Sequence, residues 1–157
     1  MTLYYKEKNN VLTKEECDFC IHFFDQFDHV KEYYENNNTF IMRLKNLNFK
    51  IKDKIINNVL SMFDLKLNYD QFVYWPDNSY MGSHKDGKAV KDNHFVSITY
   101  LNDNYKGGRT LIDNKAIKNR LGKTIVFNSQ EIEHGVEKVN GKRYTHIAWW
   151  RINEKRI

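Results

Sequence analysis

Three residues of the types that ligate metal ions stand out in the sequence: His84 and Asp86 in the segment SHKDG, and His134 in the segment EIEHG. Side chains alternate between the two faces of a β-strand. Residues two positions apart therefore point the same way, with about 7 Å between their Cα atoms. His84 and Asp86 could thus converge on one ion, with His134 as the third ligand. Two histidines and one carboxylate on one face of a metal leave coordination positions open for other molecules.

Each of these residues also has a structural interpretation that involves no metal. His84 could be an ordinary surface histidine near a turn, and Asp86, which precedes a glycine, could be a turn aspartate. His134 is also followed by a glycine and could lie at the end of a strand. A His-x-Asp pair with a distant histidine arises often by chance, so the spacing alone leaves both interpretations open.

Arg143 opens the segment RYTHIAWW and favours the metal site. Alternation places Arg143, Thr145, Ile147 and Trp149 on one face of an otherwise apolar strand. An arginine on a buried face needs a counter-charge, because an unpaired interior cation is costly. Its guanidinium group matches a carboxylate with two hydrogen bonds. The counter-charge could be the far carboxylate of a small dicarboxylic acid that chelates the metal. A protein carboxylate, or an exposed strand end, is the alternative.

Two amphipathic helices precede the segment that carries these residues. Thr13 and Glu16 match a capping box, and apolar residues at helical spacing follow, which predicts a helix from about residue 13 to residue 27. Residues 49–63 place their apolar side chains on one side and predict a second helix. Residues 31–40, KEYYENNNTF, break the helical pattern and are predicted to form a loop.

Cys17 and Cys20 are the two cysteines of the chain, at a spacing that occurs in redox and zinc motifs. A zinc site would need a further pair of ligands at suitable spacing, and a redox pair would begin a helix after a strand. Both thiols fall instead on the apolar stripe of the first predicted helix. Free cysteine behaves as a small hydrophobe, so the sequence favours core packing.

The period of the sequence changes after residue 68, where short β-rich runs are separated by glycine, asparagine and aspartate. These runs are YDQFVYW, NHFVSITYL, GRTLI, KTIVFN, IEHGVEKV and KRYTHIAWWRI. Helices followed by many short strands predict an α+β fold, a β-sandwich or barrel buttressed by helices. We expect one domain over residues 1–157, with helical support over about 1–67 and a β-barrel core over about 68–152.

Composition narrows the classes of partner. Lysine and arginine number 25 against 20 acidic residues, for a formal net charge of +5. The basic residues are spread along the chain rather than in blocks, which weakens a nucleic-acid interpretation. No apolar run is long enough to cross a membrane, and the first residues lack a signal pattern, so we expect a cytoplasmic protein. No segment is typical of dimerisation, and we expect a monomer.

Five segments, taken in order, resemble the 2-oxoglutarate and Fe(II)-dependent dioxygenases over about residues 70–151, in particular their prolyl 4-hydroxylase branch. The segments are WPDNSYMGSHKD, VSITYLND, YKGGRTLI, GKTIVFNS and HGVEKVNGKRY. Five ordered matches over half the chain are far more specific than any one motif. The segment NVLTKEECDFC also resembles the start of the family's leading helix. The resemblance implies a double-stranded β-helix, a jelly-roll barrel like that of the cupins, behind N-terminal helices.

The resemblance also implies a role for each matching residue. The implied iron ligands are His84, Asp86 and His134. Arg143 would bind the distal carboxylate of 2-oxoglutarate. Tyr100 would hydrogen-bond the same molecule, although its position also suits a core tyrosine. Thr145 and Trp149, on the strand face of Arg143, would contribute to the cofactor pocket, and Trp149 could also simply be part of the core.

The sequence departs from the family pattern at several places around the metal site. Asn78 stands where the family usually has glycine, Met81 where it often has tyrosine, and Arg109 where an acidic residue is common. None of these residues is a metal ligand, so the departures bear on substrate preference. Asn-Gly at residues 140–141 is typical of a tight hairpin turn, whereas the family fold sends the flanking strands into facing sheets.

The reaction implied by the resemblance is hydroxylation of a C–H bond, with succinate and CO₂ as co-products. It requires Fe(II), 2-oxoglutarate and O₂, with L-ascorbate as reductant, and its implied target is C4 of a proline in a peptide or protein. Lys85, Lys88 and Lys91, in and beside the loop at 87–93, could attract acidic flanks of such a peptide or could simply be solvated. The alternatives are a hydroxylase of a free amino acid or other small molecule, a nucleic-acid demethylase, and a non-catalytic barrel that binds a ligand.

Overall fold

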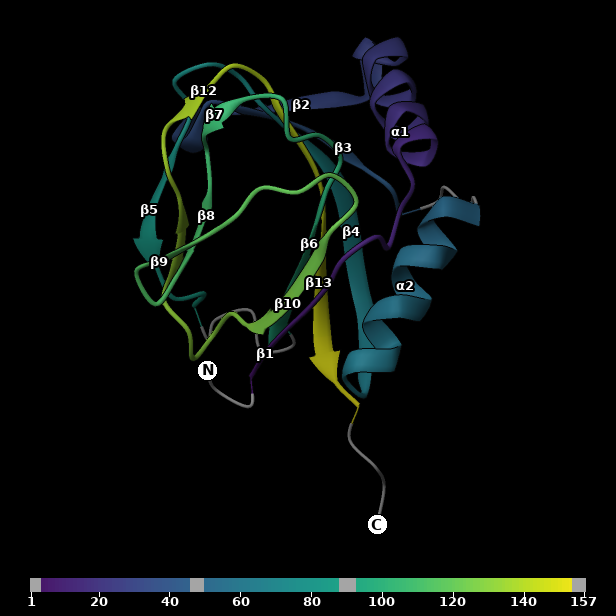
Figure 1. Cartoon of the computed structure of the whole chain (residues 1–157), viewed down its shortest axis with the longest axis vertical. Coiled ribbons are helices and arrows are strands. Elements are labelled where there is room, and N and C mark those ends of the chain that lie inside the picture. Colours follow the sequence, from purple (N-terminus) through teal and green to yellow (C-terminus); the bar gives the residue numbers. More distant parts are fainter. Residues whose placement is uncertain (1–3, 46–49, 88–92, 154–157) are drawn as a thin grey trace.

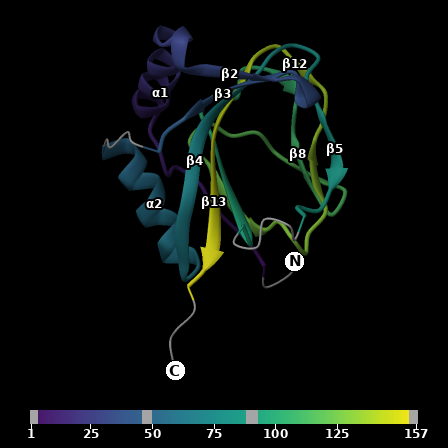
Figure 2. The ribbon, with the colours of Figure 1, turned by 180° about the vertical axis from the view of Figure 1, so that it is seen from behind.

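The structure, a computed structural model, describes residues 4–45, 50–87 and 93–153, and the statements below concern these residues. A seven-stranded antiparallel sheet has the strand order β1-β10-β6-β13-β4-β3-β2, and a four-stranded sheet has the order β5-β11-β8-β9. Both helices lie on one side of the large sheet and the small sheet lies on the other (Figures 1 and 2). None of the described helices is long and apolar enough to cross a membrane.

The helices and strands of the N-terminal part are β1 (Tyr5–Lys8), α1 (Lys14–Gln26), β2 (Lys31–Tyr34), β3 (Thr39–Arg43), α2 (Lys50–Met62) and β4 (Leu65–Trp75). The strands of the C-terminal part are β5 (Met81–His84), β6 (Phe95–Tyr100), β7 (Lys106–Gly107), β8 (Thr110–Ile112), β9 (Lys115–Ile117), β10 (Thr124–Asn128), β11 (His134–Val136), β12 (Val139–Asn140) and β13 (Arg143–Ile152). Each of the six β-rich runs predicted after residue 68 contains at least one of these strands.

Two apolar cores lie on opposite faces of the large sheet, because successive side chains of a strand point to opposite faces. On β4, Phe72 packs in the core beneath the helices, whereas Val73 packs in the core between the two sheets. On β13, Trp150 and Ile147 divide in the same way. The predicted barrel backed by helices is therefore confirmed.

Helix α1 begins where the sequence predicts. The Thr13 side chain accepts a hydrogen bond from the Glu16 backbone N–H, and the Glu16 carboxylate accepts one from Thr13. Cys17 and Cys20 are fully buried in the core beneath the helices and form no disulfide. Burial raises the pKa of both thiols to about 12, which keeps them protonated at neutral pH and supports the packing role.

Helix α2 differs in detail from the expected amphipathic pattern. Its most buried apolar residues are Ile55 and Val59, whereas Leu60 is exposed. Lys52 is also buried, and it forms an ion pair with the buried Asp70 on β4 (Nζ–Oδ1, 2.8 Å). The second oxygen of Asp70 lies 2.9 Å from His146 Nε2 on β13. Helix α2 is thus fixed to the sheet by a network of charges as well as by apolar packing.

Strands as well as helices lie within residues 1–67, where helical support was expected, and the prediction of a loop at 31–40 was wrong, because β2 and the start of β3 lie there. Three strands of the large sheet come from this part of the chain: β1 pairs with β10, β2 pairs with β3, and β3 pairs with β4. Most side chains of β1 and β2 are exposed. Both strands lie at the sheet edges, where one side of the backbone has no partner, so neither shows the alternation of a half-buried strand.

The turn at Asn140–Gly141 separates strands that belong to different sheets. β12 pairs with β7 in a small two-stranded sheet, whereas β13 runs through the large sheet between β4 and β6. Residues 140–141 therefore form no tight hairpin between paired strands. They lead the chain from one sheet to another, so that Arg143 opens β13 in the large sheet. Of the loop lysines named above, Lys88 and Lys91 lie outside the described residues, and Lys85 is exposed.

Candidate active site

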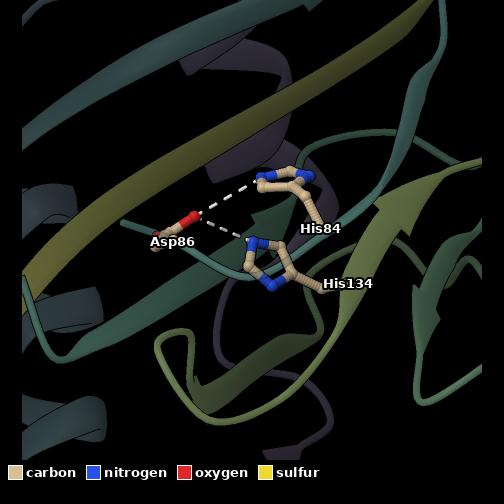
Figure 3. Close-up of side chains that lie close together, drawn as sticks. All are labelled: His84, Asp86 and His134. Carbon is tan, nitrogen blue, oxygen red and sulfur yellow. Dashed lines mark ion pairs between the residues drawn. The ribbon is translucent and has the colours of Figure 1, made fainter. Parts of the chain in front are cut away.

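Two neighbouring strands of the small sheet bring the two histidines together. His84 ends β5 and is the direct cross-strand partner of His134, which begins β11. Opposed residues on antiparallel strands project from the same face of the sheet, and the imidazole centroids lie 4.5 Å apart. Asp86 follows the end of β5, where its backbone N–H donates to the Ser129 carbonyl. The chain turns there, so the carboxylate reaches both rings (Figure 3).

One carboxylate oxygen faces both imidazoles. Oδ1 of Asp86 lies 3.4 Å from His84 Nε2 and 3.2 Å from His134 Nε2. The three candidate ligand atoms lie within 4.8 Å of one another, close enough to hold one metal ion. Burial tends to raise the pKa of Asp86. The hydrogen bond from His134 and the positive charges of His134 and His84, present when these rings are protonated, outweigh that effect and hold the pKa below its ordinary value.

The hydrogen bonds of the outer ring nitrogens favour metal ligation. His84 Nδ1 lies 2.8 Å from the Gly82 carbonyl and His134 Nδ1 lies 2.9 Å from the Ile132 carbonyl. A carbonyl can only accept, so each Nδ1 carries a proton, and the neutral form of each ring then directs the lone pair of Nε2 toward Asp86. Two lone pairs and a carboxylate oxygen repel one another unless a cation lies among them, so the donor set fits a metal ion.

Arg143 is fully buried, and two of its three guanidinium nitrogens have no hydrogen-bond partner among the described residues. Its Nη2 donates to the Thr110 hydroxyl at 3.2 Å, while Nε and Nη1 have no partner. The guanidinium carbon lies 4.8 Å from the ring centroid of Trp75, its cross-strand partner, and 5.7 Å from that of Tyr100. Aromatic walls around two unpartnered guanidinium nitrogens form a socket that fits a carboxylate from outside the chain.

Thr110 joins Arg143 to Tyr100. The Tyr100 hydroxyl lies 2.6 Å from Thr110 Oγ1, which also accepts the hydrogen bond from Arg143. Burial raises the pKa of Tyr100, so the phenol stays protonated. The Tyr105 hydroxyl is buried nearby without a hydrogen-bond partner, and burial raises its pKa to about 12 although the charge of Arg143 opposes the rise. Two phenols and a threonine thus supply further polar atoms around the guanidinium.

Asp86 and His134 of the triad line the same cavity as Arg143, a space of about 220 Å³ between the sheets. Asp86 and His134 line it on one side, and Arg143, Trp75 and Trp149 are among the residues that line it on the other. The remaining lining comes mainly from apolar residues of β4, β6, β10 and β13 and from the β2–β3 hairpin. A site of this size, mostly apolar with a few charged groups, is typical of small-molecule binding.

The predicted site residues divide into those that line the cavity and those behind them. Trp149 lines the cavity, where its ring stacks on that of Tyr69 with centroids 4.7 Å apart. Thr145 is fully buried outside the lining, where its hydroxyl accepts a hydrogen bond from the Trp75 indole at 3.3 Å. Tyr100 also lies outside the lining and contacts Arg143. The cofactor-binding roles of these three residues stay predictions.

Sequence reasoning missed several residues of the site. Thr110 lies within the matching segment YKGGRTLI and Trp75 opens the matching segment WPDNSYMGSHKD, but neither was given a role in the site. Tyr34 and Arg43 also line the cavity, and both come from the β2–β3 hairpin. Tyr34 lies in the segment that was predicted to be a loop, and Arg43 lies just beyond that segment. Only the pairing of β3 with β4, which the local sequence does not indicate, could have placed them at the cavity.

The departures at two family positions have local explanations. Asn78, at the usual glycine position, has φ = +70°, in the left-handed region that asparagine tolerates better than most residues. Arg109, at the usual acidic position, forms a bidentate ion pair with Glu137, with Nε 2.6 Å from Oε1 and Nη2 3.0 Å from Oε2. Both substitutions therefore fit this fold without disturbing the metal-binding residues.

The family follows from comparison with known proteins. Residues 70–151, more than half of the chain, match the model of the 2OG-Fe(II) oxygenase superfamily, so the chain belongs to this family. The triad and the Arg143 socket both lie within the matched segment. Family membership makes the protein a 2-oxoglutarate-dependent dioxygenase, an enzyme class that works with iron and 2-oxoglutarate. No curated protein sequence matches the chain.

Solved structures resemble the chain over nearly its whole length. A Pseudomonas putida prolyl-4-hydroxylase has a TM-score of 0.80 at 15% identity, covering 96% of this chain and 93% of that one. The viral collagen prolyl hydroxylase of Paramecium bursaria Chlorella virus-1, in complex with 2-oxoglutarate, has a TM-score of 0.74 at 19% identity, with coverages of 96% and 97%.

A third similar structure is a Trichoplax adhaerens prolyl hydroxylase in complex with a peptide fragment of the hypoxia inducible factor oxygen degradation domain. It has a TM-score of 0.76 at 16% identity, covering 96% of this chain and 84% of that one. At these identities the likeness shows the fold. It confirms the expected double-stranded β-helix of the prolyl 4-hydroxylase type.

Proposed function

We propose that the chain is a hydroxylase that acts on C4 of a proline in a peptide. The observation that carries the proposal is the pairing, across one cavity, of the histidine–carboxylate triad with the unpartnered guanidinium of Arg143. A metal and a small dicarboxylic acid would satisfy both at once. The similarity to prolyl hydroxylases, one of them solved with a peptide, supports a peptidyl proline as substrate.

In this proposal the iron ligands are His84, Asp86 and His134. Arg143 binds the distal carboxylate of 2-oxoglutarate through its free nitrogens, and Thr110 and Tyr100 fix the orientation of the guanidinium. Bound iron and 2-oxoglutarate would supply the oxidising chemistry with O₂, giving succinate and CO₂, and ascorbate would reduce iron that is oxidised in uncoupled turnovers back to Fe(II). The apolar walls keep bulk water from the reacting centre, and Trp149 on the rim contacts the substrate.

We further propose that residues 1–157 act as one monomeric domain. The large sheet supports this, because it takes strands from both parts of the chain, with β1 beside β10 and β3 beside β4. Neither part could keep its sheet intact alone. Size-exclusion chromatography with light scattering tests the monomer, and a single unfolding transition seen by several probes tests the single domain.

The first test is anaerobic titration of metal-free protein with Fe(II) and then 2-oxoglutarate. Chelation of 2-oxoglutarate by Fe(II) should produce a weak visible charge-transfer band. Asp86→Ala should abolish it, because the triad loses its carboxylate. Asp53→Asn, which changes an exposed aspartate of α2, should retain it. Correctly folded protein that never gives the band would contradict the assigned ligands.

The substrate is tested separately with proline peptides and free amino acids. Proline-containing peptides incubated with Fe(II), 2-oxoglutarate, ascorbate and O₂ should gain one oxygen atom, which mass spectrometry and fragmentation locate on the proline ring. Succinate should form in step with the hydroxylated peptide. Hydroxylation of free amino acids but of no peptide would replace the proline proposal with the small-molecule alternative and leave the dioxygenase class intact.

A further inference from the structure

The cavity wall extends well beyond the Arg143 socket, along a row of paired residues in the large sheet. Ile147 on β13 lies beside Gln71 on β4, which lies beside Arg43 on β3. Ile147 is four residues along β13 from Arg143, which corresponds to about 14 Å, and β3 is two strands away, about 10 Å. Arg43 therefore lies on a part of the cavity wall that a molecule held by Arg143 and the metal does not reach.

Arg43 brings a positive charge that the cavity does not balance. Its side chain is 53% exposed, and it forms a long ion pair with Glu32, with Nε and Oε1 3.5 Å apart. Among the described residues that line the cavity, Arg43 and Arg143 are the cations and Asp86 is the carboxylate. Because Asp86 belongs to the triad, it offers no counter-charge to Arg43.

The surroundings of Arg43 suit a substrate with an apolar part and a charged part. Tyr69 and Trp149 stack with their planes 15° apart and form a flat aromatic wall in the same cavity. Asn37 and Gln71 add neutral polar groups. A ring or aliphatic segment can pack on the aromatic wall while a neighbouring carboxylate reaches the guanidinium, which binds carboxylates with two hydrogen bonds.

We propose that Arg43 is a specificity-determining residue that binds a carboxylate of the substrate. The inference rests on the proposed function, and for a peptidyl proline the carboxylate is that of an aspartate or glutamate within about two residues of the target, the reach of a short extended segment. The same contact could be made by the terminal carboxylate of a free amino acid. Glu32 competes with the substrate for the guanidinium.

The test uses the full chain loaded with Fe(II) and 2-oxoglutarate, and peptides of equal length that carry one proline flanked by glutamate, glutamine or lysine. Both peptide ends are blocked, so that the flanking side chain is the only difference in charge. Anaerobic binding is followed by tryptophan fluorescence, and kcat/KM is followed by succinate formation. A second set of ligands consists of free amino acids with an unblocked carboxylate.

The glutamate peptide should bind about tenfold more tightly than the glutamine peptide, the scale of a hydrogen bond to a charged group. Arg43→Gln should reduce this preference to within about twofold, and Arg43→Glu should shift it toward the lysine peptide. Glu32→Gln should strengthen the preference by removing the competitor, whereas Lys66→Gln, an exposed cation elsewhere on β4, should leave it unchanged. Salt should weaken the preference, because Arg43 is half exposed.

The outcomes separate this inference from the proposed function. Equal hydroxylation of the three peptides would overturn the role of Arg43 and leave prolyl hydroxylation standing. Binding of acidic peptides that depends on Arg43, without oxygen transfer to proline, would support Arg43 and remove proline as the target. Arg43-dependent binding of free amino acids alone would support the carboxylate contact and identify its source as the substrate's own terminus.

Discussion

Replacement of Arg143 by methionine should change stability and cofactor binding in opposite directions. The guanidinium is fully buried with two nitrogens unpartnered, so in the absence of 2-oxoglutarate it carries an uncompensated desolvation cost. Apolar replacements of buried charged groups are neutral to stabilising by about 1–4 kcal/mol. The cavity beside Arg143 lets solvent offset part of that cost, so we expect a gain of about 1–2 kcal/mol.

For a chain of this length, about 1 kcal/mol corresponds to about 2–4 °C in Tm, so the variant should melt about 2–8 °C higher without 2-oxoglutarate. Its affinity for 2-oxoglutarate should fall by roughly thirtyfold or more, since removal of one partner of a buried charge pair costs about 2 kcal/mol at least. The wild-type Tm should rise with 2-oxoglutarate concentration, and the Tm of the variant should rise only at concentrations higher by at least the same factor.

Differential scanning calorimetry and anaerobic isothermal titration calorimetry measure the two effects. Arg109→Met is the matched control, because Arg109 is half exposed and pairs with Glu137 on the surface. It should change stability by less than about 1 kcal/mol and leave 2-oxoglutarate binding unchanged. A lower Tm for Arg143→Met without 2-oxoglutarate would show that protein groups already satisfy the guanidinium. Retained affinity would show that it does not bind the carboxylate.

Substitutions at three further positions probe other parts of the structure. Asp70→Asn should destabilise the fold by about 3 kcal/mol or more in urea unfolding, because Lys52 and His146 lose their buried carboxylate. Burial raises the pKa of Asp70, but these partners outweigh it and hold the pKa below its ordinary value. The wild-type advantage should thus be complete above about pH 4 and decline as the pH falls further. Asn78→Ala should cost about 1 kcal/mol at its positive φ while Asn78→Gly stays within about 0.5 kcal/mol in thermal unfolding. Thr110→Val should weaken 2-oxoglutarate binding about tenfold in titration calorimetry, because it removes the hydroxyl that accepts from Arg143 and is hydrogen-bonded to Tyr100.

The parts of the fold that sequence could predict are those with a strong local pattern. The capping box at Thr13 and Glu16 fixed the start of α1, and the β-rich runs of the central strands were visible because both faces of those strands are buried. The edge strands β1 and β2 were missed, since KEYY has no buried face to impose alternation. The burial of Lys52 could not be predicted, because its ion-pair partner Asp70 is distant in the sequence and lies beside it only in the folded chain.

The candidate site divides in the same way. His84, Asp86, His134 and Arg143 could be predicted because each lies in a motif that resembles the family, and the structure brings the first three together as a metal-binding group. The geometry that favours a metal ion could not be predicted from the sequence, because it depends on the contact of each Nδ1 with the carbonyl two residues earlier in the chain. The place of Arg43 on the cavity wall could not be predicted either, because it depends on the register of β3 against β4.

The β2–β3 hairpin presents two different surfaces. Tyr34 and Arg43 face the cavity, whereas Tyr33 and Phe40 pack against one another on the other side, where Phe40 stacks on Tyr74. This segment supplies none of the candidate metal ligands, and the residues that contact the Arg143 guanidinium, Thr110, Trp75 and Tyr100, lie outside it. Amino-acid changes on its inner face can therefore alter which molecule enters while iron and cofactor binding stay the same. Enzymes with this fold could diversify in substrate preference through changes in this one hairpin. Residues 31–43 are therefore the segment to exchange in order to change the substrate.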